Sequence, residues 1–488
     1  MSSEFFIMGR YCPNRTENEK ATSCHKEGKS TLSKNMTIKF RYLLSLCALS
    51  TQAFGSDRPN VIFLMVDDLG WTDFGCYGSD YYETPNIDKL AASGMKFTNG
   101  YAACTVCSPT RASLMTGKYI PKHGVTNYIS GKTMWLRHEE TTIAEAVKEA
   151  GYRTAHVGKW HLAPRNRKDY KDFYPTHHGF DLNIGGGEWG EPATYFHPYQ
   201  GRKSVENMPP GGKEGDFLTD RLTDETLKII DDWKEDPFFL HFAYYAVHTP
   251  IMGKPELVEY FKNKPAGKRH KRPAYAALLK SVDDSVGRIT EHLEKLGIAD
   301  RTMIILTGDN GGLVGQTWNA PLRAGKGSAY EGGVREPTIV RWPGVTPSGS
   351  VCDTPVITMD FYPTILNATG AKGNADHNQE VDGLDLSAIL KDPNASLGRD
   401  TLFWYFPHGH RRGGATPHAA IRHKDHRLIK WFNNDPIELY DLKNDISEKE
   451  NLAESMPEKT KELEAMLNAW ISETKATIPK PVGEKKKR

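Results

Sequence analysis

The sequence predicts an α/β fold with a mostly parallel sheet, followed by a small α+β unit with an antiparallel sheet. Through most of the chain, short apolar runs alternate with segments of helical spacing. Near residue 395 the pattern changes to several short strand-like runs and one helix. The 488 residues are enough for one large core and a smaller appended unit.

Four apolar runs predict buried strands of the first unit: residues 61–66, 154–157, 238–247 and 303–306. Helices are predicted between them at residues 142–150 and 275–296. In the second helix, apolar side chains recur close to helical spacing from Leu278 to Leu296. Gly- and Pro-rich stretches at residues 185–192 and 207–215 predict surface loops.

The C-terminal unit is predicted to contain four short antiparallel strands, at residues 402–406, 419–422, 427–431 and 437–440. A helix is predicted to begin near Pro457, with an apolar stripe formed by Leu463, Met466, Leu467, Trp470 and Ile471. We therefore divide the chain into an N-terminal extension (1–55), a large α/β domain (56–395) and a C-terminal subdomain (396–488).

The N-terminal extension has the pattern of an export signal. Lys39 and Arg41 form a basic region, residues 42–50 are apolar, and Ala53-Phe54-Gly55 is a small-x-small cleavage site. Met36 is the natural start, with cleavage after Gly55, and the apolar run is too short to span a bilayer. The prediction is an exported protein, periplasmic or secreted (or in the secretory or lysosomal lumen of a eukaryotic cell), with no transmembrane segment in the mature chain. The alternative is a disordered extension that stays attached.

The charge balance argues against a nucleic-acid-binding protein. The formal charge is +2, but residues 1–55 carry 8 Lys and Arg against 4 Asp and Glu. The rest carries 55 Lys and Arg against 57 Asp and Glu. An anionic substrate would therefore have to be held by local cations rather than by the net charge.

Each predicted strand of the first unit runs into polar residues, and in open α/β sheets ligands gather beyond the carboxyl ends of strands. Lys159 and His161 follow the second run, and His248 follows the third. The first and fourth runs are followed by oxygen ligands, which calcium or magnesium prefers: Asp67, Asp68, Asp309 and Asn310. The alternative is that these side chains only cap turns.

Cys107 stands in a distinctive setting. Ser108 suits a helix N-cap and Pro109 the first helical position, so Cys107 is predicted at a helix N-terminus, where an anion is favoured. Arg111, one turn along, is predicted to reach the same anion. The four cysteines after Gly55 are too few for a disulfide framework. From the residues alone, Cys107 is either a thiolate nucleophile or a buried apolar side chain.

Residues 107–117, with Cys107-Ser108-Pro109-Thr110-Arg111 followed by Leu114-Met115-Thr116-Gly117, resemble the signature of the type I sulfatases. Residues 60–70, 151–162, 307–312, 325–337 and 439–451 also resemble pieces of that family, in its order. The resemblance runs from residue 57 to about residue 475. It implies an alkaline-phosphatase-like α/β/α domain with a small C-terminal domain.

The resemblance implies that a maturation enzyme oxidises Cys107 to formylglycine, whose hydrate is the nucleophile. It implies one calcium ion held by Asp67, Asp68, Asp309, Asn310 and the modified Cys107. It also implies sulfate-binding and proton-transfer positions at Arg111, Lys159, His161, His248 and Lys326. Asp309 is the implied base for the attacking hydroxyl, His248 with Lys326 the acid, and His161 the base that releases sulfate.

The predicted substrate is a sulfated polysaccharide or oligosaccharide, because an export signal fits an extracellular glycan. His408, His410 and Arg412 are candidate substrate-binding residues; the alternative is an exposed basic loop. Trp189, Tyr195 and His197 are candidates for stacking on a sugar ring. Two rival functions are a formylglycine-dependent phosphodiesterase or phosphonate hydrolase, and a catalytically silent glycan-binding relative.

Overall fold

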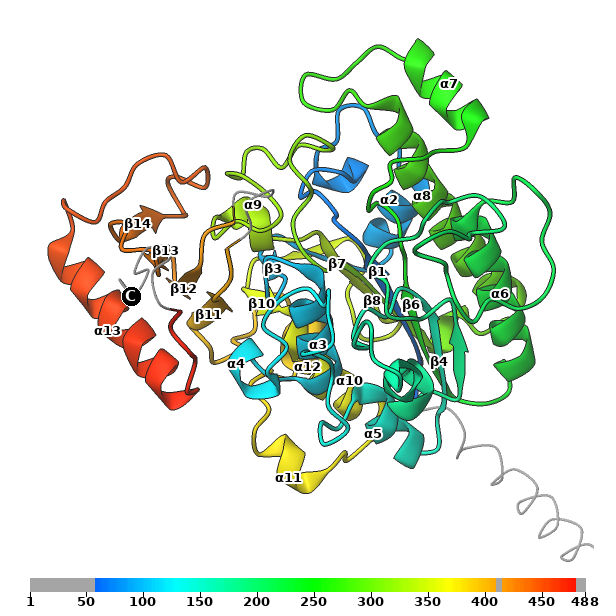
Figure 1. Cartoon of the computed structure of the whole chain (residues 1–488), viewed down its shortest axis with the longest axis horizontal. Helices are drawn as coiled ribbons and strands as arrows, with labels where there is room; N and C mark the ends of the chain where they lie inside the picture. The colour runs from blue at the N-terminus through cyan, green and yellow to red at the C-terminus, as the bar shows by residue number, and fades with distance from the viewer. Residues whose placement is uncertain (1–57, 410–414, 480–488) are drawn as a thin grey trace, which may run out of the picture. The chain divides into compact units, whose positions relative to one another are not determined.

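The computed structural model describes residues 58–409 and 415–479. Within them, eight strands form a sheet in the order β5-β4-β6-β1-β7-β8-β2-β9. Figure 1 labels its strands β4, β6, β1, β7 and β8. Neighbouring strands are parallel except at β8, which is antiparallel to β7 and β2. The bounds are β1 (Asn60–Val66), β2 (Met95–Phe97), β4 (Arg153–Gly158), β5 (Leu182–Ile184), β6 (Phe238–Ala243), β7 (Thr302–Gly308), β8 (Thr338–Arg341) and β9 (Ser350–Cys352). The predicted mostly parallel sheet is confirmed.

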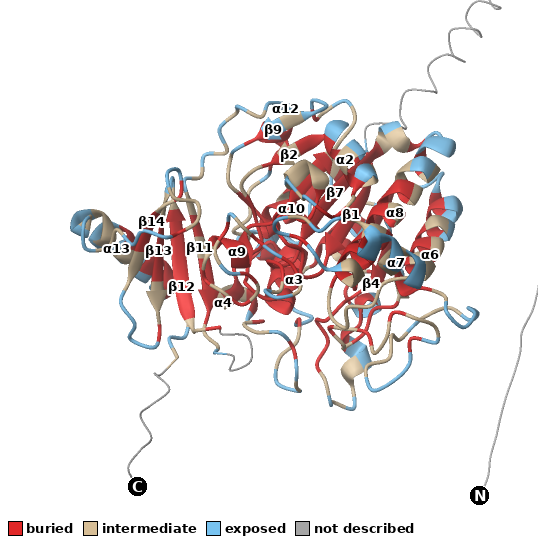
Figure 2. Ribbon diagram, turned by 90° about the horizontal axis from the view of Figure 1, so that it is seen from above, coloured by how far each residue is buried: buried red, intermediate tan, exposed pale blue. Residues whose placement is uncertain are grey.

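Helices cover both faces of this sheet, and β1 shows why. Its alternate residues Ile62, Leu64 and Val66 pack in one core, while Val61, Phe63 and Met65 pack in another. The first core is completed by α2 (Pro85–Ala92), α6 (Leu218–Trp233) and α8 (Pro273–Lys295), the second by α3 (Cys107–Thr116), α5 (Ile143–Glu149) and α10 (Phe361–Thr369). The central strands are buried throughout (Figure 2), as in the middle layer of an α/β/α sandwich.

Shorter elements complete the layers: α4 (Ile120–His123), α7 (Pro255–Asn263), α9 (Glu331–Val334), α11 (Ala375–Asn378), α12 (Ser387–Lys391), and the parallel pair β3 (Gly100–Tyr101) and β10 (Val356–Ile357). One predicted strand is too long, because β6 ends at Ala243 rather than at residue 247. Beyond it, the backbone of Val247 donates to Asp67 O, and Asp67 N donates to Ala246 O. These bonds hold the loop that carries His248 against the end of β1.

The C-terminal sheet is antiparallel, in the order β11 (Thr401–Phe406), β12 (His418–His423), β13 (His426–Trp431) and β14 (Glu438–Asp441), as predicted. Helix α13 (Pro457–Glu473) begins at the predicted Pro457 and buries Leu463, Leu467 and Trp470 in a third core with these strands. No helix among the described residues is long and apolar enough to cross a membrane. The predicted export signal lies outside the described residues.

Candidate active site

The ends of β1 and β7 bring three acids and one amide together, all buried: Asp67, Asp68, Asp309 and Asn310. The two strands pair in parallel, so their carboxyl ends lie at one edge of the sheet. Asp68 N donates to Asp309 Oδ1 at 3.2 Å, and Asn310 Nδ2 donates to Asp68 Oδ1 at 2.8 Å. Residues separated by more than two hundred positions in the sequence therefore share one site.

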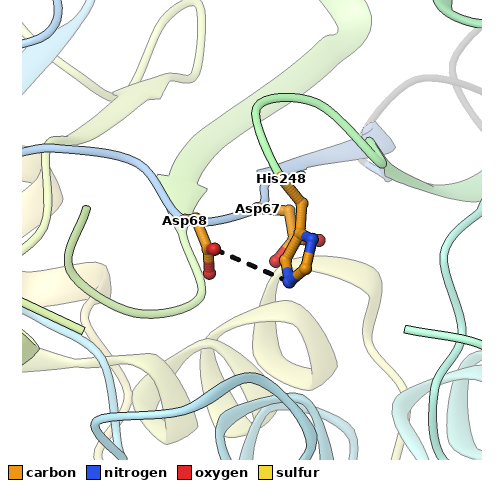
Figure 3. A group of neighbouring side chains, drawn as sticks. All are labelled: Asp67, Asp68 and His248. Carbon is orange, nitrogen blue, oxygen red and sulfur yellow. Dashed lines mark ion pairs between the residues drawn. The ribbon is translucent and has the colours of Figure 1, made fainter. Parts of the chain in front are cut away.

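Three oxygens of this group fit a cation. Asp67 Oδ1, Asp68 Oδ2 and Asn310 Oδ1 are buried and accept no hydrogen bond from any described residue. Unpaired buried acceptors are destabilising, and an all-oxygen set is what a hard divalent cation prefers. Figure 3 shows Asp67 and Asp68 beside His248, and ligand atoms of these three residues lie within 4.8 Å of one another. The residues present therefore fit a calcium ion.

Three cations contact the three acids of the site. Arg111 Nη2 lies 2.7 Å from Asp309 Oδ2, Lys159 Nζ lies 2.5 Å from Asp67 Oδ2, and Lys326 Nζ lies 2.5 Å from Asp68 Oδ1. Burial raises the pKa of Asp67, and the neighbouring Asp309 adds to the rise. For Asp68, burial acts in the same direction, but Lys326 and His248 outweigh it and lower the pKa. Asp68 is therefore held ionised by its cationic neighbours.

Cys107 is the first residue of α3 and is buried. Its Sγ lies 3.3 Å from His161 Nδ1, and His161 Nε2 lies 3.0 Å from Ile129 O. A carbonyl can only accept, so Nε2 carries the proton and Nδ1 presents a lone pair to Cys107. Burial lowers the pKa of His161 well below its ordinary value, and Lys159 adds to the effect. His161 is thus a neutral imidazole aimed at Cys107.

Ser108 does not cap the helix, contrary to the prediction. The N-cap is Val106, in an extended conformation, and α3 begins at Cys107. The Ser108 hydroxyl instead donates to His161 O at 2.8 Å and accepts from Ile129 N at 3.0 Å. The Ser108 hydroxyl therefore bonds to residues distant in the sequence, and not to the amides at the start of the helix as the local pattern had predicted. Ser108 fixes the two segments that orient the His161 ring.

His248 follows the irregular segment after β6. Its Nδ1 donates to Thr249 O at 2.9 Å, and its Nε2 lies 3.6 Å from Asp68 Oδ2 (Figure 3, dashed line). Burial lowers the pKa of His248 to about 4, although Asp68 opposes this. Without a bound anion, the imidazole is therefore uncharged at neutral pH.

A pocket of about 190 Å³ opens onto these groups. It is lined by Cys107, Tyr128, His161, Arg165, Gly190, Glu191, His248 and Lys326. Four predicted site residues thus face one cavity, while Arg111, Lys159 and the four oxygen donors are buried and do not line it. Arg165 and Glu191 were missed by sequence reasoning, because they stand in loops without periodicity or a motif.

Glu336 is another residue that sequence reasoning missed. Both of its carboxylate oxygens are buried without a hydrogen-bond donor among the described residues. Burial raises its pKa well above the ordinary value, and the negative charge of Asp309 adds to the rise. Glu336 packs against Gly308, where a Cβ would lie 1.9 Å from its Oε2.

The predicted sugar-binding residues lie in different parts of the chain. His408 contacts the Thr126 hydroxyl at 2.9 Å and does not line the pocket, and His410 and Arg412 lie outside the described residues. Tyr195 cannot stack on a sugar, because it is buried and its hydroxyl donates to Tyr245 O and His248 O. It positions the His248 backbone instead.

Comparisons with known proteins show which family the chain resembles. The family model described as "Sulfatase" matches residues 59–371, and that of "N-sulphoglucosamine sulphohydrolase, C-terminal" matches residues 325–477. A sulfatase of Formosa agariphila is 34% identical, over 90% of this chain and 94% of its own. N-acetylgalactosamine-6-sulfatase of Mus musculus is 32% identical, over 83% and 86%. The crystal structure of Ps i-CgsB in complex with k-i-k-neocarrahexaose superposes with a TM-score of 0.73 at 32% identity, over 85% and 92%.

Proposed function

The chain belongs to the sulfatase family and is a sulfuric ester hydrolase, and we propose that it desulfates a carbohydrate with a formylglycine made from Cys107 and one calcium ion. The observation that carries the proposal is the contact between Cys107 and the unprotonated Nδ1 of His161, at 3.3 Å. Both line the pocket, beside a cluster of buried carboxylates. A nucleophile and a base thus face one cavity, and the proposed cation site adjoins it through the contacts of Lys326 and His248 with Asp68.

The proposed calcium ligands are Asp67, Asp68, Asp309, Asn310 and the modified Cys107. The three unpaired oxygens of Asp67, Asp68 and Asn310 support this set. When bound, the ion would hold a sulfate oxygen and favour ionisation of an attacking hydroxyl. Neutralisation of the carboxylates would leave the charges of Arg111, Lys159 and Lys326 available to a sulfate, since each now contacts an acid.

Formylglycine hydrate supplies two hydroxyls, one to attack sulfur and one to assist the later release of sulfate. Asp309 is the proposed acceptor of the first proton, and Arg111 holds its Oδ2 in place. His161 is the proposed acceptor of the second, because its Nδ1 already faces Cys107 and Ile129 O fixes its tautomer. Two bases with different surroundings thus serve the two stages.

His248 is the proposed acid that protonates the ester oxygen as the sulfur–oxygen bond breaks. It lines the pocket beside Lys326, which would assist. Burial keeps the imidazole neutral in the ligand-free protein, with a pKa of about 4. A sulfate anion in the pocket would favour the charged imidazolium, since an opposite charge nearby raises the pKa of a histidine.

A sulfated polysaccharide or oligosaccharide is the proposed substrate. Two relatives at 32% identity support it, one named N-acetylgalactosamine-6-sulfatase and one solved with k-i-k-neocarrahexaose. The proposed site of action is outside the cytoplasm, after export and after a maturation enzyme has oxidised Cys107. A substrate-binding role for His408, His410 and Arg412 remains a proposal.

Peptide mass spectrometry of active protein tests the nucleophile. The peptide containing residue 107 should be about 18 Da lighter than its cysteine form. Cys107→Ala should retain its fold, by circular dichroism, and lose about 10³-fold or more in turnover of nitrophenyl sulfate. Full turnover by Cys107→Ala would refute the proposal. Release of sulfate from defined sulfated oligosaccharides, set against hydrolysis of nitrophenyl phosphodiesters, tests the substrate class.

A further inference from the structure

Arg165 lines the pocket with its charge unpaired. Its Nε is buried without a hydrogen bond, and among the described residues its guanidinium makes neither a hydrogen bond nor an ion pair. The guanidinium carbon lies 3.8 Å from the centre of the Trp189 ring. Stacking fixes the plane of the guanidinium and leaves its edge for a ligand.

Arg167, two residues along the same loop, shows what is unusual about Arg165. Its guanidinium also stacks on a tryptophan, 4.4 Å from the ring centre of Trp135. However, Arg167 forms a bidentate ion pair, because Nε and Nη2 on one edge of its guanidinium donate to Asp169 at 2.8 and 2.5 Å. Stacking an arginine on tryptophan is thus a shared device of this loop, whereas an unpaired fork distinguishes Arg165 from Arg167.

The acids nearest to Arg165 already have other partners. Glu191 forms an ion pair with Lys203 and lies 3.6 Å from His248 Nδ1. Glu188 accepts from the Tyr174 hydroxyl at 2.7 Å. Their carboxylates are close enough to favour the charged form of Arg165, although burial outweighs them and lowers its pKa. The guanidinium therefore lies in a partly desolvated side of the pocket and has no ion-pair partner of its own among the described residues.

Arg165 and Trp189 lie on a side of the pocket that adjoins the reacting groups. Trp189 and Glu191 flank Gly190, which packs on the His161 ring so closely that a Cβ would lie 2.3 Å from Cε1. His161 in turn contacts Cys107. The pocket of about 190 Å³ is smaller than typical ligand cavities of roughly 300–1,000 Å³, so one sugar residue would reach both sides.

We propose that Arg165, held flat by Trp189, binds a second anionic group of the substrate, a sulfate ester or a carboxylate, near the sulfate that is removed. This inference rests on the proposed function. The reacting sulfate already has Lys326 within the pocket and Arg111 and Lys159 behind it. A planar fork suits the paired oxygens of a second sulfate or of a uronate. The preferred substrates are therefore dianionic sugars.

Competition against nitrophenyl sulfate tests this inference whichever sugar the enzyme prefers. Inhibition constants are measured for a panel of monosulfated hexoses and hexosamines, their disulfated counterparts, and monosulfated disaccharides with and without a uronic acid. The disulfated and uronate arms distinguish the two sources of charge. In the wild type, at least one dianionic sugar should bind about 10- to 100-fold more tightly than its monoanionic counterpart. Arg165→Gln should reduce this ratio to near one, and Arg167→Gln, the matched control, should retain it.

The ratio of the inhibition constants of monoanionic and dianionic sugars shows whether Arg165 binds a second anionic group or simply the reacting sulfate. If Arg165→Gln weakens mono- and dianionic sugars equally, the side chain serves the reacting sulfate and the inference is wrong. It is also wrong if the wild type prefers no dianionic sugar in the panel. Trp189→Ala, which removes the platform but keeps the charge, should lower the ratio in part. Failure of the wild type to hydrolyse nitrophenyl sulfate or any sulfated sugar would instead overturn the proposed function.

Discussion

Two clusters of buried charged residues in this protein differ in which of their polar atoms lack a hydrogen bond. The active-site cluster comprises Asp67, Asp68, Asp309 and Asn310 with Arg111, Lys159 and Lys326. The Glu331 cluster comprises Tyr101, Glu331, Arg335, Arg422, Arg427 and Glu448, and connects α9 and β3 with the C-terminal sheet. Both contain carboxylates and arginines removed from water.

In the Glu331 cluster the central carboxylate is fully bonded. Glu331 Oε1 accepts from Arg427 Nη1 at 2.9 Å, and Oε2 accepts from the Tyr101 hydroxyl at 2.8 Å and from Arg335 Nη1 at 3.1 Å. Glu331 N donates to Glu448 Oε2 at 2.8 Å. Two atoms of the cluster, Arg427 Nε and Glu448 Oε1, have no hydrogen bond among the described residues, and they face each other at 3.6 Å.

In the active-site cluster, by contrast, several acceptor oxygens are not hydrogen-bonded. Three of its acceptor oxygens, from Asp67, Asp68 and Asn310, have no donor among the described residues. A cation that enters this group would give these oxygens the partner they lack, whereas the central carboxylate of the Glu331 cluster needs no added ligand. Buried charge alone therefore does not identify a functional site. Several buried acceptor oxygens that lie together without hydrogen-bond donors do identify one.

Neutralising one carboxylate in each cluster should separate activity from stability. Asp68→Asn should lower the turnover of nitrophenyl sulfate by on the order of 10³-fold, because it removes an ion ligand and the partner of Lys326. Glu331→Gln should lower the free energy of unfolding by about 3–5 kcal/mol, because it leaves Arg427 and Arg335 buried with an incomplete partner. Turnover per folded molecule and denaturant unfolding are measured for both.

A partly exposed ion pair provides the control. Glu464→Gln removes the partner of Lys430 at 2.8 Å, and should change stability by less than about 1 kcal/mol and leave turnover intact. The comparison fails if folded Glu331→Gln loses as much turnover as Asp68→Asn. It fails equally if Asp68→Asn unfolds the protein while Glu331→Gln does not.

Within the active-site cluster, proton transfer can be separated from anion binding at His248. A sugar oxygen is a poor leaving group and needs a proton, whereas nitrophenolate leaves without help. His248→Gln should therefore reduce glycan desulfation about 10²-fold more than hydrolysis of nitrophenyl sulfate. Both substrates are compared in metal-saturated wild type and variant. Equal losses would assign His248 to sulfate binding and leave the acid role to Lys326.

The sequence was informative where chemistry follows strand ends. Asp67, Asp68, Asp309 and Asn310 were predictable as neighbours because parallel strands end at one edge of a sheet, and the residues around Cys107 form a motif. The Glu331 cluster was not predictable, because Glu331 meets Arg427 and Tyr101 across 96 and 230 positions without a periodic pattern. Arg165 carries no local signal either, since only the folded loop shows that it has no ion-pair partner in the part of the chain that the structure describes.

Removal of calcium should destabilise the protein through the active-site cluster only. A ligand bound by the folded state alone adds about 2.7 kcal/mol to stability when its free concentration is 100 times the dissociation constant. Chelation should therefore lower the melting temperature of the wild type. Asn310→Ala should show a smaller calcium-dependent shift, and Glu448→Gln the full wild-type shift. An identical shift in Asn310→Ala, measured over a calcium titration, would exclude this ligand set.

A further effect is expected from Glu448, and it depends on pH. Burial raises the pKa of Glu448 to about 8, against the opposing charge of Arg427, from an ordinary value of 4.5. Between these values the folded protein keeps a proton that the unfolded chain has released. The stabilisation is therefore complete below pH 4.5 and is lost as the pH rises through 8, with a slope of at most about 1.4 kcal/mol per unit.

Glu448→Gln tests this slope, because glutamine keeps an acceptor for Glu331 N and cannot titrate. Unfolding free energies of wild type and variant are compared from pH 5 to 9 at saturating calcium, so that the active-site carboxylates contribute equally to both. The variant should gain stability relative to the wild type as the pH rises, and the difference should level off above the folded pKa. A difference that is independent of pH would mean that Glu448 is ionised throughout, paired with Arg427 as an ordinary buried ion pair. The Glu331 cluster would then be stabilised by an ion pair between Glu448 and Arg427, and Glu448 would not retain a proton.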